Sequence, residues 1–201
     1  MIAIIDYGVG NLFSLKCSLK KIGLSAEVTA DINQINSADK IILPGVGAFG
    51  DAILKLKTSG LDKVVKDQIK REKPLLGICL GMQLLFEKSY EYGEHDGLNV
   101  LKGSVNPLAD SVKNLRVPHM GWNALNFTKQ SPLFKYVNEG EYVYFVHSYH
   151  AENCNDSLIA TSFYGKDVTA AVQSGNVFAT QFHPEKSGDT GLRILKAFGE
   201  L

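Results

Sequence analysis

The first 87 residues alternate four times between a short apolar run and a helical pattern. The candidate strands are residues 2–5, 25–29, 40–43 and 74–79, of which the first is fully apolar. Runs this short and this apolar are typical of strands in the middle of a parallel sheet, where both faces are buried. The alternation therefore predicts an α/β fold with a mostly parallel central sheet and helices on both faces.

The second half of the chain has a different pattern. Residues 116–123 hold the only tryptophan and are predicted to be irregular, and a final helix is predicted at about residues 190–198. Short strand-like runs separated by turn residues predict antiparallel strands added to the parallel core, at residues 99–105, 142–146, 158–163, 168–173 and 177–181. No repeat, low-complexity tract or linker interrupts the pattern, so residues 1–201 are predicted to form one domain.

Composition narrows the classes of function. Lys+Arg and Asp+Glu are both 21, so the net charge of zero gives no support for nucleic acid or an anionic membrane as a partner. Three cysteines without paired spacing argue against a disulfide framework or a metal site. No apolar stretch approaches the roughly 20 residues of a membrane helix, and the N-terminus lacks the basic start of a signal peptide. A cytoplasmic location is expected.

Cys79 lies where the fourth predicted strand ends and a helix, predicted to reach about residue 87, begins. A glycine stands two residues to each side of it, in Gly-Ile-Cys-Leu-Gly. This is the spacing of a nucleophile elbow with cysteine in place of serine. A thiol at a helix N-terminus is favoured as the reactive thiolate, which marks Cys79 as a candidate nucleophile. The alternative is a buried structural cysteine between two core elements.

Two further loops follow predicted parallel strands, at residues 6–11 and 44–50. Both are rich in glycine, and the second holds three glycines in six residues, which lets backbone amides approach a ligand closely. An ordinary strand-to-helix turn is the alternative for the second loop, and a dinucleotide loop is disfavoured for the first because Ser14 replaces the third glycine. Sites in such sheets lie at the carboxyl ends of the strands, so both loops and Cys79 are expected to converge on one edge.

A cysteine nucleophile needs a base and the base needs an orienting acceptor. His183 and Glu185 are two residues apart around a proline, so in an extended segment they share one side. Glu185 could then hold one imidazole nitrogen while the other faces Cys79. His147 is a competing base at another strand end, and with Ser148 and Tyr149 it is interpreted as part of a substrate-binding wall.

Acyl transfer also needs hydrogen-bond donors for the developing oxyanion. The backbone amide of Leu80, directly after the nucleophile, is one candidate. The second donor should come from a loop at the same sheet edge, and Val46 and Gly47 are the candidates. Loss of one such donor typically costs about 3–4 kcal/mol in barrier, so the conformation of this loop could switch the activity.

Taken together, the motifs Gly-Ile-Cys-Leu-Gly-Met-Gln, Pro-Gly-Val-Gly and Gln-Phe-His-Pro-Glu-Lys-Ser resemble the class I (triad) glutamine amidotransferases. Within that family the chain is most similar to glutaminase subunits of imidazole glycerol phosphate synthase. The segments that carry this narrower resemblance are residues 6–11, 44–50, 118–123 and 144–149. The resemblance implies a flavodoxin-like class I glutamine amidotransferase fold and no cofactor.

The resemblance also implies roles for individual residues. Cys79 would attack the glutamine amide and form a thioester, His183 would protonate the departing ammonia, and Glu185 would orient His183. Gln83 would hold the amino-acid end of the substrate and Glu91 its ammonium. The backbone of His147, Ser148 and Tyr149 would bind the substrate carboxylate.

The expected partner is a cyclase subunit, a (β/α)8 barrel that receives the ammonia and makes imidazole glycerol phosphate and an aminoimidazole carboxamide ribotide for histidine biosynthesis. The resemblance places four residues on the face that meets it: Asn11, Met120, Trp122 and Lys186. A core position is the alternative for Trp122. Two other functions stay open, a glutaminase that serves another synthase and a catalytically silent regulatory subunit, although the intact Cys79, His183 and Glu185 argue against the second.

Overall fold

The structure is a computed structural model that describes residues 1–113 and 115–201. Its main sheet has the strand order β2-β1-β3-β4-β14-β13-β12-β9. The first five of these strands run parallel: β2 (Ala26–Thr29), β1 (Ile2–Ile5), β3 (Lys40–Leu43), β4 (Leu75–Ile78) and β14 (Val177–Thr180). Antiparallel strands complete the sheet: β13 (Asp167–Ser174), β12 (Leu158–Phe163) and β9 (Asn126–Phe127). The parallel part has the flavodoxin-like order 2-1-3-4-5, which confirms the predicted fold class.

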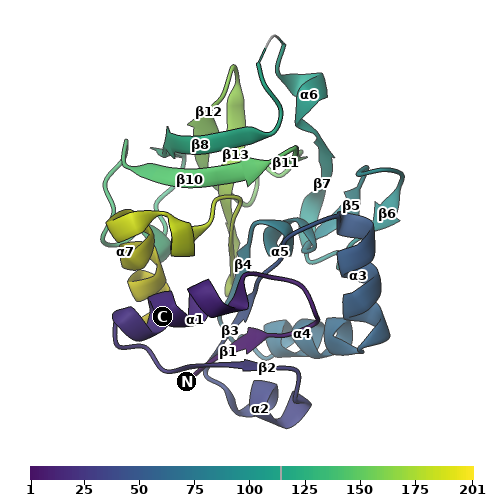
Figure 1. Cartoon of the computed structure of the whole chain (residues 1–201), viewed down its shortest axis with the longest axis vertical. Coiled ribbons are helices and arrows are strands. Elements are labelled where there is room, and N and C mark those ends of the chain that lie inside the picture. Colours follow the sequence, from purple (N-terminus) through teal and green to yellow (C-terminus); the bar gives the residue numbers. More distant parts are fainter. Residues whose placement is uncertain (114) are drawn as a thin grey trace.

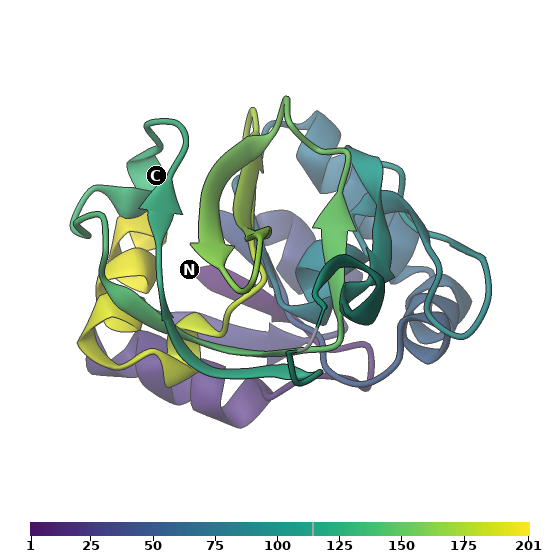
Figure 2. The same ribbon diagram turned by 90° about the horizontal axis from the view of Figure 1, so that it is seen from above.

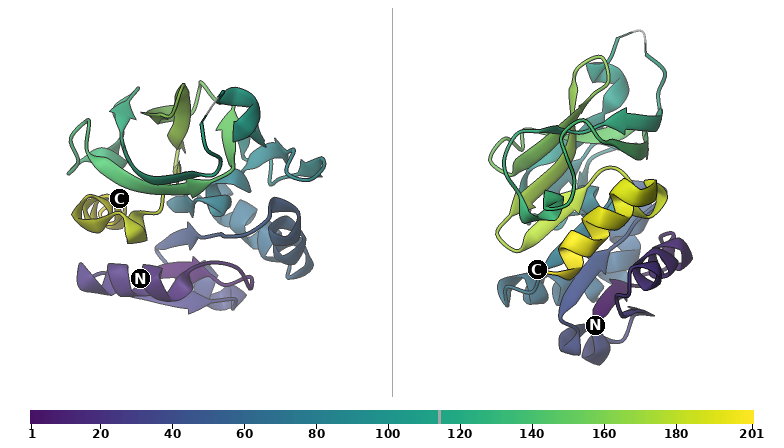
Figure 3. Two further views of the ribbon diagram at one scale, coloured as in Figure 1. Left: turned by 45° about the horizontal axis from the view of Figure 1, so that its top comes forward. Right: turned by 90° about the vertical axis from the view of Figure 1, so that its left-hand side faces the viewer.

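Helices cover both faces of the parallel strands (Figure 1 and Figure 3). On one face lie α1 (Leu12–Lys21) and α7 (Gly188–Gly199). On the other lie α2 (Ile32–Ser37), α3 (Phe49–Thr58) and α4 (Leu61–Lys70). No helix in the described part of the chain is long and apolar enough to cross a membrane.

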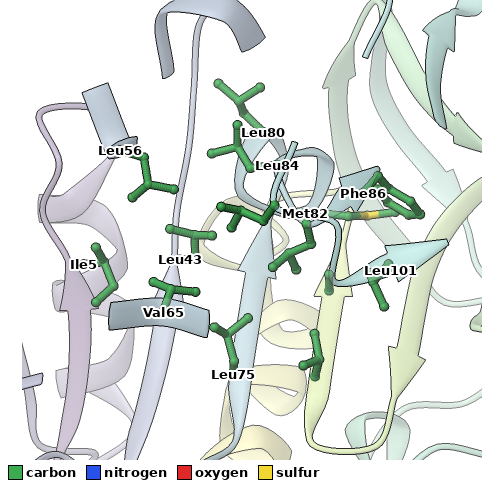
Figure 4. Packing of buried hydrophobic residues seen from close by; sticks show 14 of the residues in the cluster. Ile5, Leu43, Leu56, Val65, Leu75, Leu80, Met82, Leu84, Phe86 and Leu101 are labelled. Atoms are coloured by element: carbon green, nitrogen blue, oxygen red, sulfur yellow. The ribbon is translucent and has the colours of Figure 1, made fainter. Parts of the chain in front are cut away.

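Side chains that alternate along each parallel strand pack into the hydrophobic core on both faces of the sheet. Ile2 and Ile4 pack with α1 and α7, whereas Ala3 and Ile5 pack with α2, α3 and α4. Successive side chains of a strand point to opposite faces, so a strand covered on both sides must be apolar throughout. Figure 4 shows the core between the sheet and helices α2, α3 and α4, in which strand residues such as Leu43 pack with Leu56 of α3 and Val65 of α4.

Two smaller sheets stand beyond the carboxyl ends of the parallel strands. One pairs β8 (His119–Ala124) with β10 (Tyr142–His147), and Figure 2 shows these two as long, curved neighbours. The other has the order β11-β7-β5-β6. It is made of β11 (Tyr149–Glu152), β7 (Leu101–Pro107), β5 (Phe86–Ser89) and β6 (His95–Asp96). Short helical turns complete the described chain: α5 (Leu80–Gln83), α6 (Leu108–Ser111), and the 3-10 turns η1 (Pro132–Phe134) and η2 (Pro184–Lys186).

Three predictions are wrong. Residues 177–181, predicted as an added antiparallel strand, instead hold β14, which pairs parallel with β4 inside the main sheet. The helix after Cys79 ends at Gln83 and not near residue 87, because Phe86 already belongs to β5 and pairs with Leu101. Every residue from 80 to 86 is buried, and a run that is buried on all sides has no periodicity to distinguish helix from strand. Residues 119–123 are not irregular but lie in β8, whose residues pair with residues of β10 that lie 18 to 28 positions later in the sequence.

Candidate active site

Cys79 stands at the turn between β4 and α5, in a backbone conformation that non-glycine residues rarely adopt. Its φ is 54° and its ψ is −112°. Its backbone N–H donates to Thr180 O at 2.7 Å, which ties the turn to the neighbouring strand β14. Such a strained strand-to-helix turn is the defining geometry of a nucleophile elbow. The spacing of the two glycines therefore predicted the turn correctly.

Close contacts leave no room for a side chain at either glycine of the elbow, Gly77 or Gly81. A Cβ added at Gly81 would lie 1.9 Å from Leu43 O, on the backbone of the adjacent strand β3. At Gly77 it would lie 2.9 Å from Leu85 Cδ1 and 3.0 Å from Gly81 O. Absence of side chains at both positions lets the turn pack directly on β3 and on its own first helical residues.

The glycine-rich loop that follows β3 packs against the elbow. A Cβ at Gly45 would lie 2.7 Å from the Gly81 nitrogen and 2.9 Å from the Tyr7 hydroxyl. That hydroxyl donates to Pro44 O at 2.7 Å, and burial raises the pKa of Tyr7. Loops 6–11 and 44–50 and the elbow therefore meet at one sheet edge, as predicted.

His183 and Glu185 form a buried pair beside the elbow. His183 Nδ1 lies 2.8 Å from Glu185 Oε1, and the two side chains are 2% and 3% exposed. Burial lowers the pKa of His183, but hydrogen bonds with Cys79 and Glu185 outweigh it and raise the pKa to about 10. A carboxylate beside a buried imidazole fixes its tautomer and stabilises its cationic form. The arrangement favours the imidazolium form of His183, with Glu185 behind it.

A cavity of about 310 Å³ opens in front of Cys79 and His183. Its walls bring together segments that are far apart in sequence. They include these residues predicted for the oxyanion, the substrate and the partner: Val46, Gly47, Leu80, Gln83, Glu91, His147, Ser148, Tyr149 and Lys186. The roles assigned to them are not settled by their position and stay predictions.

His147 is not placed to act as the general base. Its Nδ1 lies 2.9 Å from Tyr149 O, so this nitrogen carries the hydrogen and donates it. Its Nε2 lies 3.1 Å from His119 Nδ1 and accepts from it. Burial lowers the pKa of His147 to about 3 and that of His119 to about 4, so both rings are neutral. His147 supports the wall of the cavity, and its hydrogen bond with His119 holds it there.

Glu91 is tied to the start of α3. Its Oε2 accepts from the Phe49 N–H at 2.6 Å, and the side chain is largely buried at the wall of the cavity. Burial raises the pKa of Glu91, whereas the Phe49 N–H opposes that rise. The predicted role of binding an ammonium fits a carboxylate fixed in this position, because a cation would replace lost solvation.

Gln181 contacts the nucleophile, and the sequence interpretation missed it. The side chain is fully buried, and its Nε2 lies 3.7 Å from Cys79 Sγ. Its Oε1 accepts from Gln83 Nε2 at 2.9 Å. Gln181 directly follows β14, which ends at Thr180, so its place at the carboxyl end of a strand could have identified it.

The residues predicted for the partner face differ in exposure. Met120 and Trp122 of β8 are 62% and 53% exposed, so the alternative that Trp122 belongs to the core is wrong. Lys186 is exposed, and Asn11 is half-buried beside Glu185. Within residues 1–113 and 115–201, no three His, Cys, Asp or Glu side chains gather closely enough to hold a metal ion.

Comparison with known proteins agrees with this geometry. Residues 3–200 match the family model described as "Glutamine amidotransferase class-I". The chain is 50% identical over its full length to "Imidazole glycerol phosphate synthase subunit HisH" of Caldanaerobacter subterraneus subsp. tengcongensis, of which 98% is covered. It is 49% identical, again over its full length, to the protein of the same description from Oceanobacillus iheyensis, of which 99% is covered.

Solved structures support the fold. A structure described as "Crystal structure of glutamine amidotransferase" superimposes with a TM-score of 0.77, at 20% identity, over 99% of this chain and 100% of that one. A structure of PurLQS from Thermotoga maritima gives a TM-score of 0.74, at 20% identity, over 98% of this chain and 96% of that one. At this identity the likeness concerns the fold alone.

Proposed function

The chain belongs to the class I glutamine amidotransferases, and we propose that it is the glutaminase subunit of an imidazole glycerol phosphate synthase. The observation that carries this proposal is the meeting of Cys79, at a strained elbow, with the buried His183–Glu185 pair beside a cavity of about 310 Å³. Full-length identity of 49–50% to relatives described as subunits of that synthase supports the choice of pathway, histidine biosynthesis.

In the proposed reaction Cys79 attacks the amide carbon of glutamine and forms a covalent bond to it. His183 gives its proton to the amide nitrogen, which leaves as ammonia, and a γ-glutamyl thioester remains on Cys79. A water molecule that gives a proton to His183 then attacks the thioester, and glutamate departs as the thiol is restored. Glu185 keeps the Nδ1–H of His183 engaged throughout, so that Nε2 is the atom that exchanges the proton.

The negative charge that develops on the carbonyl oxygen needs fixed donors. We assign this role to the backbone amide of Leu80 and to an amide of Val46 or Gly47. All three residues line the cavity beside Cys79. The positive φ of Gly47, +92°, and the open space around it suit a peptide plane that can turn without steric conflict. An oxyanion site completed by this loop gives the partner a place to control the activity.

The substrate would lie with its amino-acid end against Gln83, Glu91 and the 147–149 wall. Both hydrogens of the Gln83 amide are already donated, to Tyr149 O at 3.0 Å and to Gln181 Oε1 at 2.9 Å. Its Oε1 is then the atom that faces the ligand, and an oxygen suits the ammonium of glutamine. Glu91 supplies the opposite charge to that ammonium, and the backbone of Ser148 and Tyr149 would hold the carboxylate.

The ammonia is delivered, in this proposal, to a cyclase subunit that binds over Asn11, Met120, Trp122 and Lys186. The exposure of the large apolar Met120 and Trp122 supports a protein partner on this face, because aromatic and Met side chains are enriched at such interfaces. We also propose a cytoplasmic location, where a cysteine nucleophile stays reduced.

Synthesis of imidazole glycerol phosphate by the complex with its cyclase tests the proposal directly. Cys79→Ser should lose glutamine-dependent synthesis by about 10³-fold or more and keep ammonia-dependent synthesis, since free ammonia bypasses the thioester. Loss of both activities together would contradict the division of labour. Glutamine hydrolysis that never supports the histidine-pathway product, but supports another amination, would favour the alternative synthase.

A further inference from the structure

A buried chain of hydrogen bonds leads from the cavity wall to the nucleophile. Gln83 Nε2 donates to Tyr149 O at 3.0 Å and to Gln181 Oε1 at 2.9 Å. Gln181 Nε2 in turn lies 3.7 Å from Cys79 Sγ. The two glutamine side chains are 5% and 0% exposed, so solvent does not compete for these bonds.

The orientation of both amides follows from one backbone atom. Tyr149 O is a carbonyl oxygen and can only accept, so the Gln83 atom that faces it must be the NH₂ group. The second hydrogen of that NH₂ faces Gln181, and the Gln181 atom there must be an oxygen. The NH₂ group of Gln181 therefore points at the sulfur of Cys79, and the sulfur is the acceptor.

The amide of Gln181 can donate a hydrogen bond to the Cys79 sulfur throughout the reaction, whereas His183 cannot. A hydrogen bond to a charged acceptor is stronger than one to a neutral acceptor, so the bond favours the thiolate over the thiol. His183 also donates to the thiolate, but it must later surrender its proton to the leaving ammonia. The carboxamide of Gln181 does not ionise, so it holds the sulfur in place through the whole reaction.

We propose that Gln181 is a further catalytic residue, which stabilises the Cys79 thiolate through an N–H···S hydrogen bond and is itself held by Gln83. This inference rests on the proposed function, because it takes Cys79 as the nucleophile. It adds a second fixed donor on the sulfur and links the residue that faces the substrate's amino-acid end to the reacting atom.

Alkylation of Cys79 by iodoacetamide, measured against pH on the complex with the cyclase, tests the proposal. Gln181→Met keeps the length of the side chain and removes the donor. Its pH midpoint should rise by about one unit, so at pH values below the wild-type midpoint it should alkylate about 10-fold more slowly. Gln181→Glu keeps an oxygen for Gln83 but places a carboxylate at the sulfur, and its midpoint should rise further. Rates and midpoints equal to wild type in both variants would overturn the proposal.

Gln68→Met is the matched control. Gln68 is a buried glutamine on α4 whose Nε2 donates to Asn36 Oδ1 at 2.7 Å, away from the candidate site. The Gln68→Met variant loses a buried amide hydrogen bond just as Gln181→Met does. The pH midpoint for alkylation of Cys79 in this variant should equal that of wild type. An equal shift in both variants would mean that general loosening moves the midpoint, and that outcome would also overturn the proposal.

A measurement on the wild type covers the case in which the Gln181 variants do not fold. The side-chain ¹H–¹⁵N signals of Gln181 should move with pH at the same midpoint as alkylation, and should shift when Cys79 is alkylated. Signals that ignore both events would exclude the N–H···S bond. The Cys79→Ser variant tests the proposed function separately. If Cys79 is not the nucleophile, this variant keeps glutamine-dependent synthesis, whatever the Gln181 variants show.

Discussion

His183 Nδ1 lies 2.8 Å from Glu185 Oε1, in a pair that is almost completely buried beside the elbow of Cys79. Burial alone would make this histidine neutral, yet its hydrogen bonds with Cys79 and Glu185 raise its pKa to about 10. His183 is therefore held in its charged form by Cys79 and Glu185.

Glu185→Gln should lower kcat for glutamine hydrolysis by on the order of 10²- to 10⁴-fold. The carboxamide oxygen can still accept from His183 Nδ1–H, but the negative charge that stabilises the imidazolium is gone. Steady-state kinetics in the complex with the cyclase measures the effect. KM for glutamine should change little, and a change confined to KM would show that Glu185 acts on binding instead.

Glu91→Gln should raise KM for glutamine by about 10- to 100-fold, the range expected for loss of a charge-assisted hydrogen bond. The Gln side chain still offers an oxygen to the Phe49 N–H, which Glu91 Oε2 accepts at 2.6 Å in the wild type, so α3 keeps its cap. Thermal unfolding should confirm that the variant is as stable as wild type. A stable variant with an unchanged KM would remove Glu91 from the ammonium site.

Trp122→Ala should weaken binding of the cyclase by about 30-fold, the effect of losing one aromatic anchor worth about 2 kcal/mol. Folding should be unaffected, because Trp122 is 53% exposed. Titration calorimetry with purified cyclase measures the dissociation constant. Leu54→Ala is a suitable control, since Leu54 is 64% exposed on α3, outside the proposed face. Equal effects of the two changes would speak against an interface on β8.

The His119–His147 pair should make the fold sensitive to acid. Burial lowers the pKa of His119 to about 4 and that of His147 to about 3, against 6.5 for the free side chain. Below pH 6.5 the unfolded chain binds protons that the folded chain does not, so stability is complete above pH 6.5 and falls as the pH drops toward 4. Each histidine contributes a slope of up to about 1.4 kcal/mol per pH unit in this window.

Urea unfolding at pH 5, 6 and 7 would measure that slope. His119→Phe keeps a ring that can stack on Phe145 and Tyr164, whose centroids lie 4.7 and 4.1 Å from that of His119, and it removes one titrating group. The variant should show a shallower loss of stability with acid than wild type, whatever its stability at pH 7. Parallel curves would refute the assignment.

Gly81→Ala should destabilise the fold by about 3 kcal/mol or more, because its Cβ would overlap Leu43 O at 1.9 Å and backbone atoms cannot move aside cheaply. Gly77→Ala should cost less, since its closest contact, at 2.9 Å, is the end of the Leu85 side chain. Chemical denaturation of the two variants ranks them. The reverse order would contradict the packing of the elbow on β3.

Local patterns in the sequence determined much of this protein. The apolar runs predicted the parallel strands β1, β3 and β4, because strands buried on both faces have few polar positions. The glycines around Cys79 predicted the elbow, because only their missing side chains admit the turn. The spacing of His183 and Glu185 predicted their pairing, although the structure brings them together through the 3-10 turn η2 and not through an extended segment. The motifs then identified the family.

Tertiary structure alone decided what depends on partners distant in sequence. β8 is a strand because it forms hydrogen bonds with β10, and the helix after Cys79 is short because Phe86 pairs with Leu101. His147 is not placed to act as the base because His119 and Tyr149 O occupy its two nitrogens. The contact of Gln181 with Cys79 joins residues 102 positions apart. Hydrogen bonds of this kind have no period in the sequence, since the chain must fold before donor and acceptor meet.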